Sequence, residues 1–142
     1  MTDALPSDHP SIVSYRVTLG RVGSTNRPQL PLPEELTCES SEYIRLTVDG
    51  TRTHAEVTES LRGERTVIGA YANRRMARMG EGTDILGEWL RENGYEPGET
   101  VVLDVLTEGY AYGVREPGAR VIYHPVEKPN SSLADIAQSL DE

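Results

Sequence analysis

Two stretches of the chain combine arginine and asparagine in a way that suits the binding of phosphates or nucleic-acid bases. No acidic residue lies between His9 and Pro33, and none lies between Arg65 and Gly80. Arginine offers a rigid fork of donors that matches phosphate or a guanine edge, and asparagine can pair with adenine through two hydrogen bonds. We therefore predict a binding site formed by Arg21, Asn26, Arg27, Asn73, Arg74, Arg75 and Arg78.

The same arginines have two simpler roles open to them. Arg16 and Arg21 suit outward strand faces, where they would pair with acids elsewhere, and Arg74, Arg75 and Arg78 suit salt bridges that hold a loop in place. A small anionic ligand, such as a nucleotide, is a further alternative. The two binding hypotheses need both stretches to meet on one surface.

Residues for other chemistry lack the spacing that catalysis or metal binding requires. His9, His54 and His124 are scattered, so no zinc site is indicated. The sequence holds no nucleophile elbow, phosphate-binding loop or dinucleotide fingerprint. Cys38 is the single cysteine and cannot form a disulfide within the chain. We expect neither an enzyme nor a cofactor.

The charge balance points to a salt-rich environment. The 142 residues include 23 acidic and 14 basic ones, a net charge of -9, and Lys128 is the single lysine. Many carboxylates with few lysines keep a protein dispersed in concentrated salt, which suggests a halophilic archaeon. A genome rich in G and C is the alternative explanation. Because no apolar run is long enough to cross a bilayer, we expect a cytoplasmic protein without membrane contact.

Alternating apolar and polar residues predict mainly strands. Asp49-Gly50 is a strong hairpin signal, and Thr83 to Asn93 has the apolar stripe of a helix, with Thr83 as N-cap. Pro33 to Leu36 resembles a first helical turn, and Asn73 to Gly80 reads as a basic connection. The strands are expected at residues 13–19, 29–32, 43–48, 53–57, 66–71, 100–106, 110–114 and 120–123.

The order of elements repeats. We expect a flexible arm over 1–11, a barrel over 12–124 with halves of about 12–60 and 61–124, and a linker with a short C-terminal helix over 125–142. Each half reads strand, loop, strand, helix, strand, strand. One copy cannot bury its apolar face, whereas two interleaved copies close a small barrel and leave no long exposed edge. The predicted fold is mainly β with short helices, that is, a closed barrel or pseudobarrel.

The segments LPEEL…EYIRLTVDG and LGEWLRENGYEPGETVVLDVL carry a resemblance to known domains. They resemble AbrB-type swapped-hairpin domains and the related B3-type DNA-binding pseudobarrels over roughly residues 13–123. The whole chain also resembles an uncharacterised family of halophilic archaeal proteins. The first resemblance implies a barrel and is compatible with DNA binding, although here both halves lie in one polypeptide.

These observations favour a DNA-binding, regulator-like barrel that acts as a monomer or homodimer. The arginines would contact phosphates, and Asn26, Asn73 and one or two arginines would contact bases. The alternative is a protein-interaction module whose C-terminal helix binds a partner through Leu133, Ile136 and Leu140.

Overall fold

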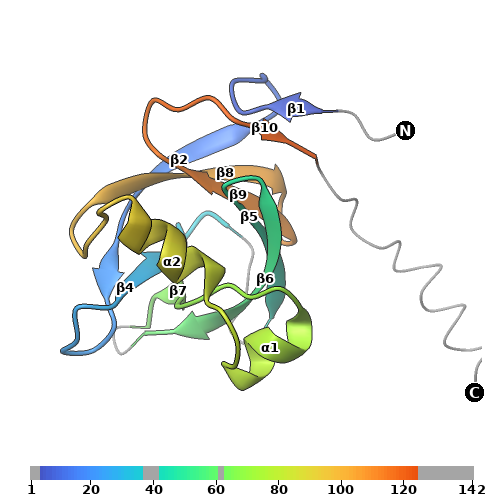
Figure 1. Cartoon of the computed structure of the whole chain (residues 1–142). Helices are drawn as coiled ribbons and strands as arrows, with labels where there is room; N and C mark the ends of the chain where they lie inside the picture. Colours follow the sequence, from blue (N-terminus) through green and yellow to red (C-terminus); the bar gives the residue numbers. More distant parts are fainter. Residues whose placement is uncertain (1–3, 37–41, 61–62, 125–142) are drawn as a thin grey trace, which may run out of the picture.

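A computed structural model describes residues 4–36, 42–60 and 63–124 of the chain. Strands dominate it, as the sequence predicts, and two short helices join them (Figure 1). The strands are β1 (Leu5–Pro6), β2 (Val13–Thr18), β3 (Gly20–Arg21), β4 (Pro28–Pro31), β5 (Tyr43–Val48), β6 (Thr51–Glu59), β7 (Arg65–Val67), β8 (Thr100–Thr107), β9 (Ala111–Arg115) and β10 (Ile122–Tyr123). The helices are α1 (Arg74–Met79) and α2 (Ile85–Glu92).

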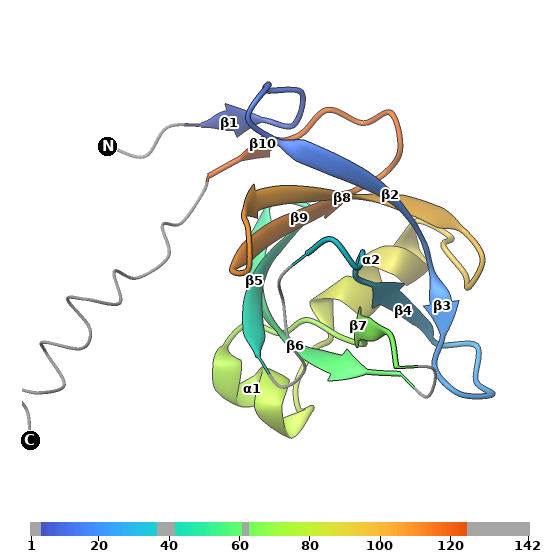
Figure 2. The ribbon, with the colours of Figure 1, turned by 180° about the vertical axis from the view of Figure 1, so that it is seen from behind.

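Eight strands form one strongly curved sheet in the order β2-β8-β9-β5-β6-β7-β4-β3. The first and last strands of this order are neighbours in sequence, since only Leu19 separates β2 from β3. The sheet therefore almost closes into a barrel (Figures 1 and 2), which confirms the predicted fold class. Among the described residues, no helix has both the length and the apolar character needed to cross a membrane.

Two hairpins form the centre of the sheet. In β5 the side chains of Ile44, Leu46 and Val48 are buried, whereas the intervening side chains face outward. Asp49 and Gly50 turn the chain into β6 with φ angles of 49° and 78°, as the sequence predicts for a tight hairpin turn. The second hairpin, β8–β9, lies beside the first because β9 pairs with β5 in parallel.

Pairing between the two halves is only partly symmetrical. The leading strand of each half pairs with the hairpin of the other half, since β2 pairs with β8 and β7 pairs with β6. The two pairings nevertheless differ. Strand β2 pairs with β8, the first strand of its hairpin, whereas β7 pairs with β6, the second strand of its hairpin. The parallel β5–β9 pair likewise has no counterpart between β8 and β6 in the described sheet.

Both helices begin at polar caps. Asp84, rather than the predicted Thr83, caps α2 by accepting a hydrogen bond from the Gly87 amide. Leu86 and Leu90 of α2 are buried in the barrel core, as its apolar stripe predicts. The prediction of a connection over Asn73 to Gly80 was wrong, because α1 forms there. Hydrophobic periodicity does not indicate α1, because Ala77 is its one buried residue and the helix has almost no apolar stripe.

Three other segments differ from their expected forms. Pro33–Leu36 is a turn instead of a helix, with the Leu36 amide donating to the Pro33 carbonyl over 3.1 Å. The strand expected over 66–71 ends at Val67, and only the Tyr71 bridge to His54 continues the pairing. Near the N-terminus, part of the segment expected to be a flexible arm pairs as β1 with β10.

The predicted linker and C-terminal helix over 125–142 lie outside the described residues, and so does Cys38. The residues predicted to bind a partner, Leu133, Ile136 and Leu140, also lie outside the described residues.

Candidate nucleic-acid interface

Helix α1 presents most of the predicted arginines to solvent. Arg74, Arg75 and Arg78 are all exposed, while Ala77 anchors the helix against the barrel. Among the described residues, none of these three guanidinium groups forms an ion pair. The reading in which they hold a loop through salt bridges therefore finds no support within the described chain.

Arg27, by contrast, is held by a carboxylate. Its Nη2 lies 3.2 Å from Oδ2 of Asp84, and the Arg27 side chain remains 46% exposed. The other oxygen of Asp84 accepts the backbone amides of Ala70 and Gly87, each over 3.0 Å. Asp84 thus joins the β3–β4 connection to the N-terminus of α2. Arg27 is thus engaged in an ion pair, although nearly half of its side chain stays exposed.

The two acid-free stretches meet at one shallow pocket of about 290 Å³. Arg27 from the first stretch and Arg78 from the second both line it, together with Gly69 and Met79. Glu56 contributes a carboxylate to the same lining. We call Arg27, Arg74, Arg75 and Arg78 the α1 face.

Of the remaining predicted residues, two lie outside the α1 face and the third caps a helix. Arg21, in β3, and Asn26, in the β3–β4 connection, are exposed, but neither lines the pocket that Arg27 and Arg78 share. The tip of this connection points away from α1 in both views (Figures 1 and 2). The Asn73 side chain accepts a hydrogen bond from the Met76 amide over 2.8 Å and caps α1. Its oxygen is therefore already engaged within the fold.

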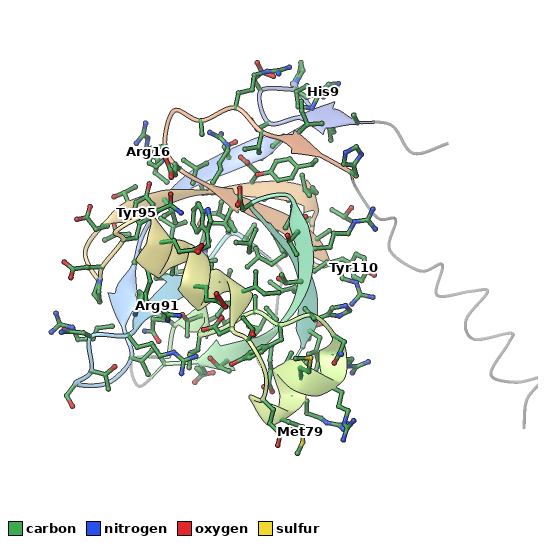
Figure 3. The ribbon with its side chains drawn as sticks, in the orientation of Figure 1. His9, Arg16, Met79, Arg91, Tyr95 and Tyr110 are labelled. Carbon is green, nitrogen blue, oxygen red and sulfur yellow. The ribbon has the colours of Figure 1, made fainter. Side chains whose placement is uncertain are left out.

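Sequence reasoning missed a group of residues beside α1, on the outer side of the first hairpin. Tyr43 and Arg45 point outward from β5, and Arg45 lies opposite His54 of β6 in the strand register. The Arg45 guanidinium lies 5.4 Å from the Tyr110 ring centre, and that of Arg74 lies 4.6 Å from the Tyr43 ring centre. Figure 3 shows Tyr110 on this side of the barrel. We call Tyr43, Arg45, His54 and Tyr110 the β5–β6 cluster.

A second group that sequence reasoning missed is buried and structural. Asp104 is fully buried and accepts hydrogen bonds from the Tyr123 hydroxyl, from Ser14 and from Arg115, whose Nε lies 2.8 Å from Oδ2. Burial and the Asp104 carboxylate raise the pKa of Tyr123 well above its ordinary value. The Tyr123 ring lies over Gly113, where an added Cβ would clash with the ring. This group ties β10 to the main sheet.

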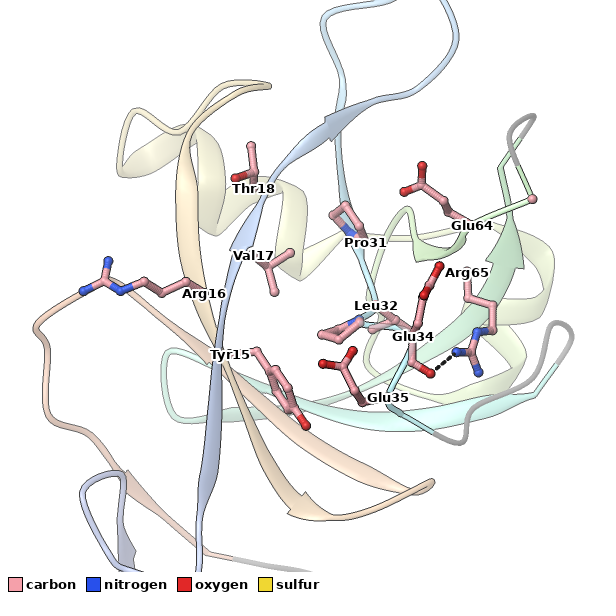
Figure 4. A pocket seen from close by; sticks show the side chains of 12 residues that line it. Tyr15, Arg16, Val17, Thr18, Pro31, Leu32, Glu34, Glu35, Glu64 and Arg65 are labelled. Carbon is pink, nitrogen blue, oxygen red and sulfur yellow. Dashed lines mark hydrogen bonds between the residues drawn. The ribbon is translucent and has the colours of Figure 1, made fainter.

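Another pocket, of about 590 Å³, lies along β2 and the turn after β4 (Figure 4). Glu34, Glu35 and Glu64 line it, with Arg16 and Arg65. The Arg65 guanidinium donates to the Glu34 carbonyl over 3.1 Å. Carboxylates outnumber arginines here, so this pocket is poorly suited to a phosphate.

A third pocket, of about 480 Å³, lies between the β3–β4 connection and α2. Asn26, Arg27, Arg91 and Tyr95 line it, together with the carboxylates of Asp84 and Glu96. Figure 3 shows Arg91 and Tyr95 on this side of the barrel. In the part of the chain that the structure describes, no group of three His, Cys, Asp or Glu side chains is placed to hold a metal ion.

Comparison with known proteins identifies the family without assigning an activity. A family of unknown function (DUF7112) matches residues 1–140, so the chain belongs to this family. This match confirms the expected membership of an uncharacterised family. No curated protein matches the chain.

Proposed function

We propose that this family member is a nucleic-acid-binding barrel domain that contacts the phosphate backbone through the α1 face. The supporting observation is that Arg74, Arg75 and Arg78 are exposed and form no ion pair among the described residues of a chain with a net charge of -9. In such an acidic protein, three neighbouring cations create a local field that attracts polyanions. DNA is the ligand that the resemblance to B3-type and AbrB-type barrels favours.

The ion pair and the helix cap revise the expected roles of individual residues. Arg74, Arg75 and Arg78 contact phosphates, and Arg27 adds a fourth cation from the edge of the shared pocket. Asn73 supports α1 instead of reading a base, because its oxygen is occupied by the cap. Specificity for sequence then has to come from other groups, since phosphate contacts carry no sequence information.

High salt limits how much phosphate contacts alone can contribute. Affinity for duplex DNA falls with salt by about 0.9 logarithmic units per phosphate contact for each tenfold rise in salt. For a protein of a halophilic cytoplasm, which the acidic composition favours, we infer that shape and stacking contacts supply a large share of the affinity.

The test is binding to duplex DNA, followed by fluorescence anisotropy while the salt concentration is varied. Arg74→Ala with Arg75→Ala should weaken binding by at least about tenfold and reduce the salt slope by roughly two contacts. Arg16→Ala with Arg120→Ala is the matched control, because it removes two exposed arginines from other parts of the surface. Unchanged affinity of the Arg74/Arg75 variant, or an equal loss in the control, would discard the proposal.

A small anionic ligand is the second candidate, supported by the pocket between the β3–β4 connection and α2. Arg27 and Arg91 supply two cations there and Tyr95 an aromatic ring, whereas Asp84 and Glu96 oppose an anion. Adenosine monophosphate should raise the melting temperature if this pocket binds nucleotides, and Arg91→Ala should remove that shift. No shift in the unmodified protein would eliminate this candidate.

A further inference from the structure

The β5–β6 cluster brings aromatic rings and guanidinium groups together beside α1. Buried Ile44 and Leu46 fix the alternation of β5, so Tyr43 and Arg45 must face outward. Tyr110 reaches the same side because β9 runs parallel to β5, and the Arg45 amide donates to the Tyr110 carbonyl over 2.7 Å.

His54 holds Arg45 in place within this surface. Arginine can only donate hydrogen bonds, so His54 must accept the bond from Nη1 of Arg45 through an unprotonated Nδ1. Burial and the neighbouring charges of Arg45 and Arg74 lower the pKa of His54, which keeps the ring neutral at pH 7. The Arg45 guanidinium is thereby fixed over the Tyr110 ring rather than free to turn toward solvent.

Two arginine–tyrosine pairs lie at this surface. Arg45 covers Tyr110, and Arg74 covers Tyr43. Because Arg74 also belongs to the α1 face, the phosphate-binding helix and the stacking surface share a residue. Glu56, which lies opposite Tyr43 in the strand register, places a carboxylate at the side of the pocket that holds Arg27 and Arg78.

We propose that the nucleic acid bound here is single-stranded, with its bases stacking on the β5–β6 cluster and its phosphates contacting the arginines of α1. This inference rests on the proposed function and specifies the ligand of the same site. Bases of a single strand expose their faces, and flat aromatic or guanidinium groups on a β surface bind them without regard to sequence. In a duplex those faces are stacked on one another and unavailable.

The shape of α1 also favours a single strand. A protein usually reads duplex DNA by placing a helix or a two-stranded ribbon in the major groove. Helix α1 has only six residues and packs on the barrel through Ala77, so it does not project as a reading element. Its arginines are nevertheless well placed to follow the backbone of a strand that crosses β5 and β6.

The experiment compares the full-length protein with a single-stranded oligothymidylate of about 12 nucleotides and with a duplex of the same length, by fluorescence anisotropy. We expect the single strand to bind at least about fivefold more tightly than the duplex. Tyr110→Leu should weaken single-strand binding by about tenfold, the loss of one stacking contact, whereas Tyr110→Phe should retain it. Arg45→Met is a second variant that removes the guanidinium plane and should give a similar loss.

Several outcomes overturn the inference. The inference is wrong if the protein binds the duplex more tightly than the single strand. It is also wrong if both Tyr110→Leu and Arg45→Met bind the single strand with unchanged affinity. In those cases the proposed function survives if Arg74→Ala with Arg75→Ala still weakens the duplex complex. Absence of binding to either oligonucleotide removes the proposed function along with the inference.

Discussion

At the scale of single residues, Asp104 shows how one buried charge organises the fold. Its carboxylate accepts hydrogen bonds from Ser14, Arg115 and Tyr123, which belong to three different strands. A buried ion pair contributes little beyond an apolar substitute, but removing one partner leaves the other charge uncompensated. Arg115 is only 13% exposed, so it cannot recover its hydration when Asp104 is lost.

Asp104→Asn should therefore lower the free energy of unfolding by about 3 to 5 kcal/mol. Urea denaturation followed by tryptophan fluorescence measures the change. Asp8→Asn is the control, because it breaks the exposed pair with Arg120 and should alter stability by less than about 1 kcal/mol. Equal effects of the two substitutions would contradict the structural role given to Asp104.

His54 gives the protein a stability that depends on pH. Its folded-state pKa is lowered by burial, Arg45 and Arg74, so the unfolded chain binds this proton at a higher pH than the folded chain. The neutral ring therefore contributes stability that is present above its ordinary pKa of 6.5 and is lost as the pH falls below it. When the pH is lowered from about 7.5 to about 5.5, the free energy of unfolding should fall less in His54→Gln than in the unmodified protein. Urea denaturation at each pH measures this change. An identical pH dependence in both proteins would show that His54 is not the group responsible.

Part of the β5–β6 cluster was predictable from the sequence. A two-residue turn at Asp49-Gly50 sets the register of the hairpin, and that register places Arg45 opposite His54. Tyr110 was not predictable in this way, because its position depends on the parallel pairing of β9 with β5, which no local pattern encodes.

At the scale of elements, α1 shows how caps can define a helix that has almost no apolar stripe. Asn73 caps its start, and Gly80, with φ of 68°, ends it in the left-handed conformation. The sequence contains both capping residues, but the run between them lacks hydrophobic periodicity, which is the stronger signal for a helix, and therefore favours a connection. Hairpin β5–β6 was found because its alternation and its turn agree.

Two substitutions at Asn73 can distinguish its role as the cap of α1 from a role in contacting bases. Asn73→Ala should cost about 1 kcal/mol of stability, because the Met76 amide loses its acceptor. Asn73→Ser keeps a capping oxygen but lacks the amide group, so both stability and nucleic-acid affinity should stay close to those of the unmodified protein. Thermal denaturation and anisotropy measure the two quantities. Loss of affinity in a stable Asn73→Ser variant would return this residue to the base-reading role first expected.

At the scale of the whole molecule, the barrel brings the two acid-free stretches only partly together. Arg27 and Arg78 share a pocket, but Arg21 and Asn26 do not line it. The arginines of both stretches that the sequence singled out are exposed, whereas their convergence depends on which loops the closed sheet brings together. That arrangement follows from long-range pairings such as β4 with β7.

The net charge of -9 makes the folded state sensitive to salt. Repulsion among carboxylates opposes the compact state, and raising KCl from about 0.1 M to about 1 M shortens the screening length from roughly 10 Å to 3 Å. The melting temperature should rise over this range. Sucrose at equal osmolality serves as the comparison, and it should raise the melting temperature less. A melting temperature that stays constant or falls in KCl would contradict the expectation that the protein comes from a salt-rich environment.

The most direct test of the account is to locate the bound nucleic acid on the protein surface. A titration of the ¹⁵N-labelled protein with single-stranded oligothymidylate, followed by two-dimensional amide and arginine side-chain spectra, gives this location residue by residue. We predict that the largest shifts fall on Arg74, Arg75 and Arg78 of α1 and on Arg45 and Tyr110, with little change around Arg16 and Arg120. Shifts concentrated around Arg16 and Arg120, with α1 unaffected, would contradict the proposed location of the binding site.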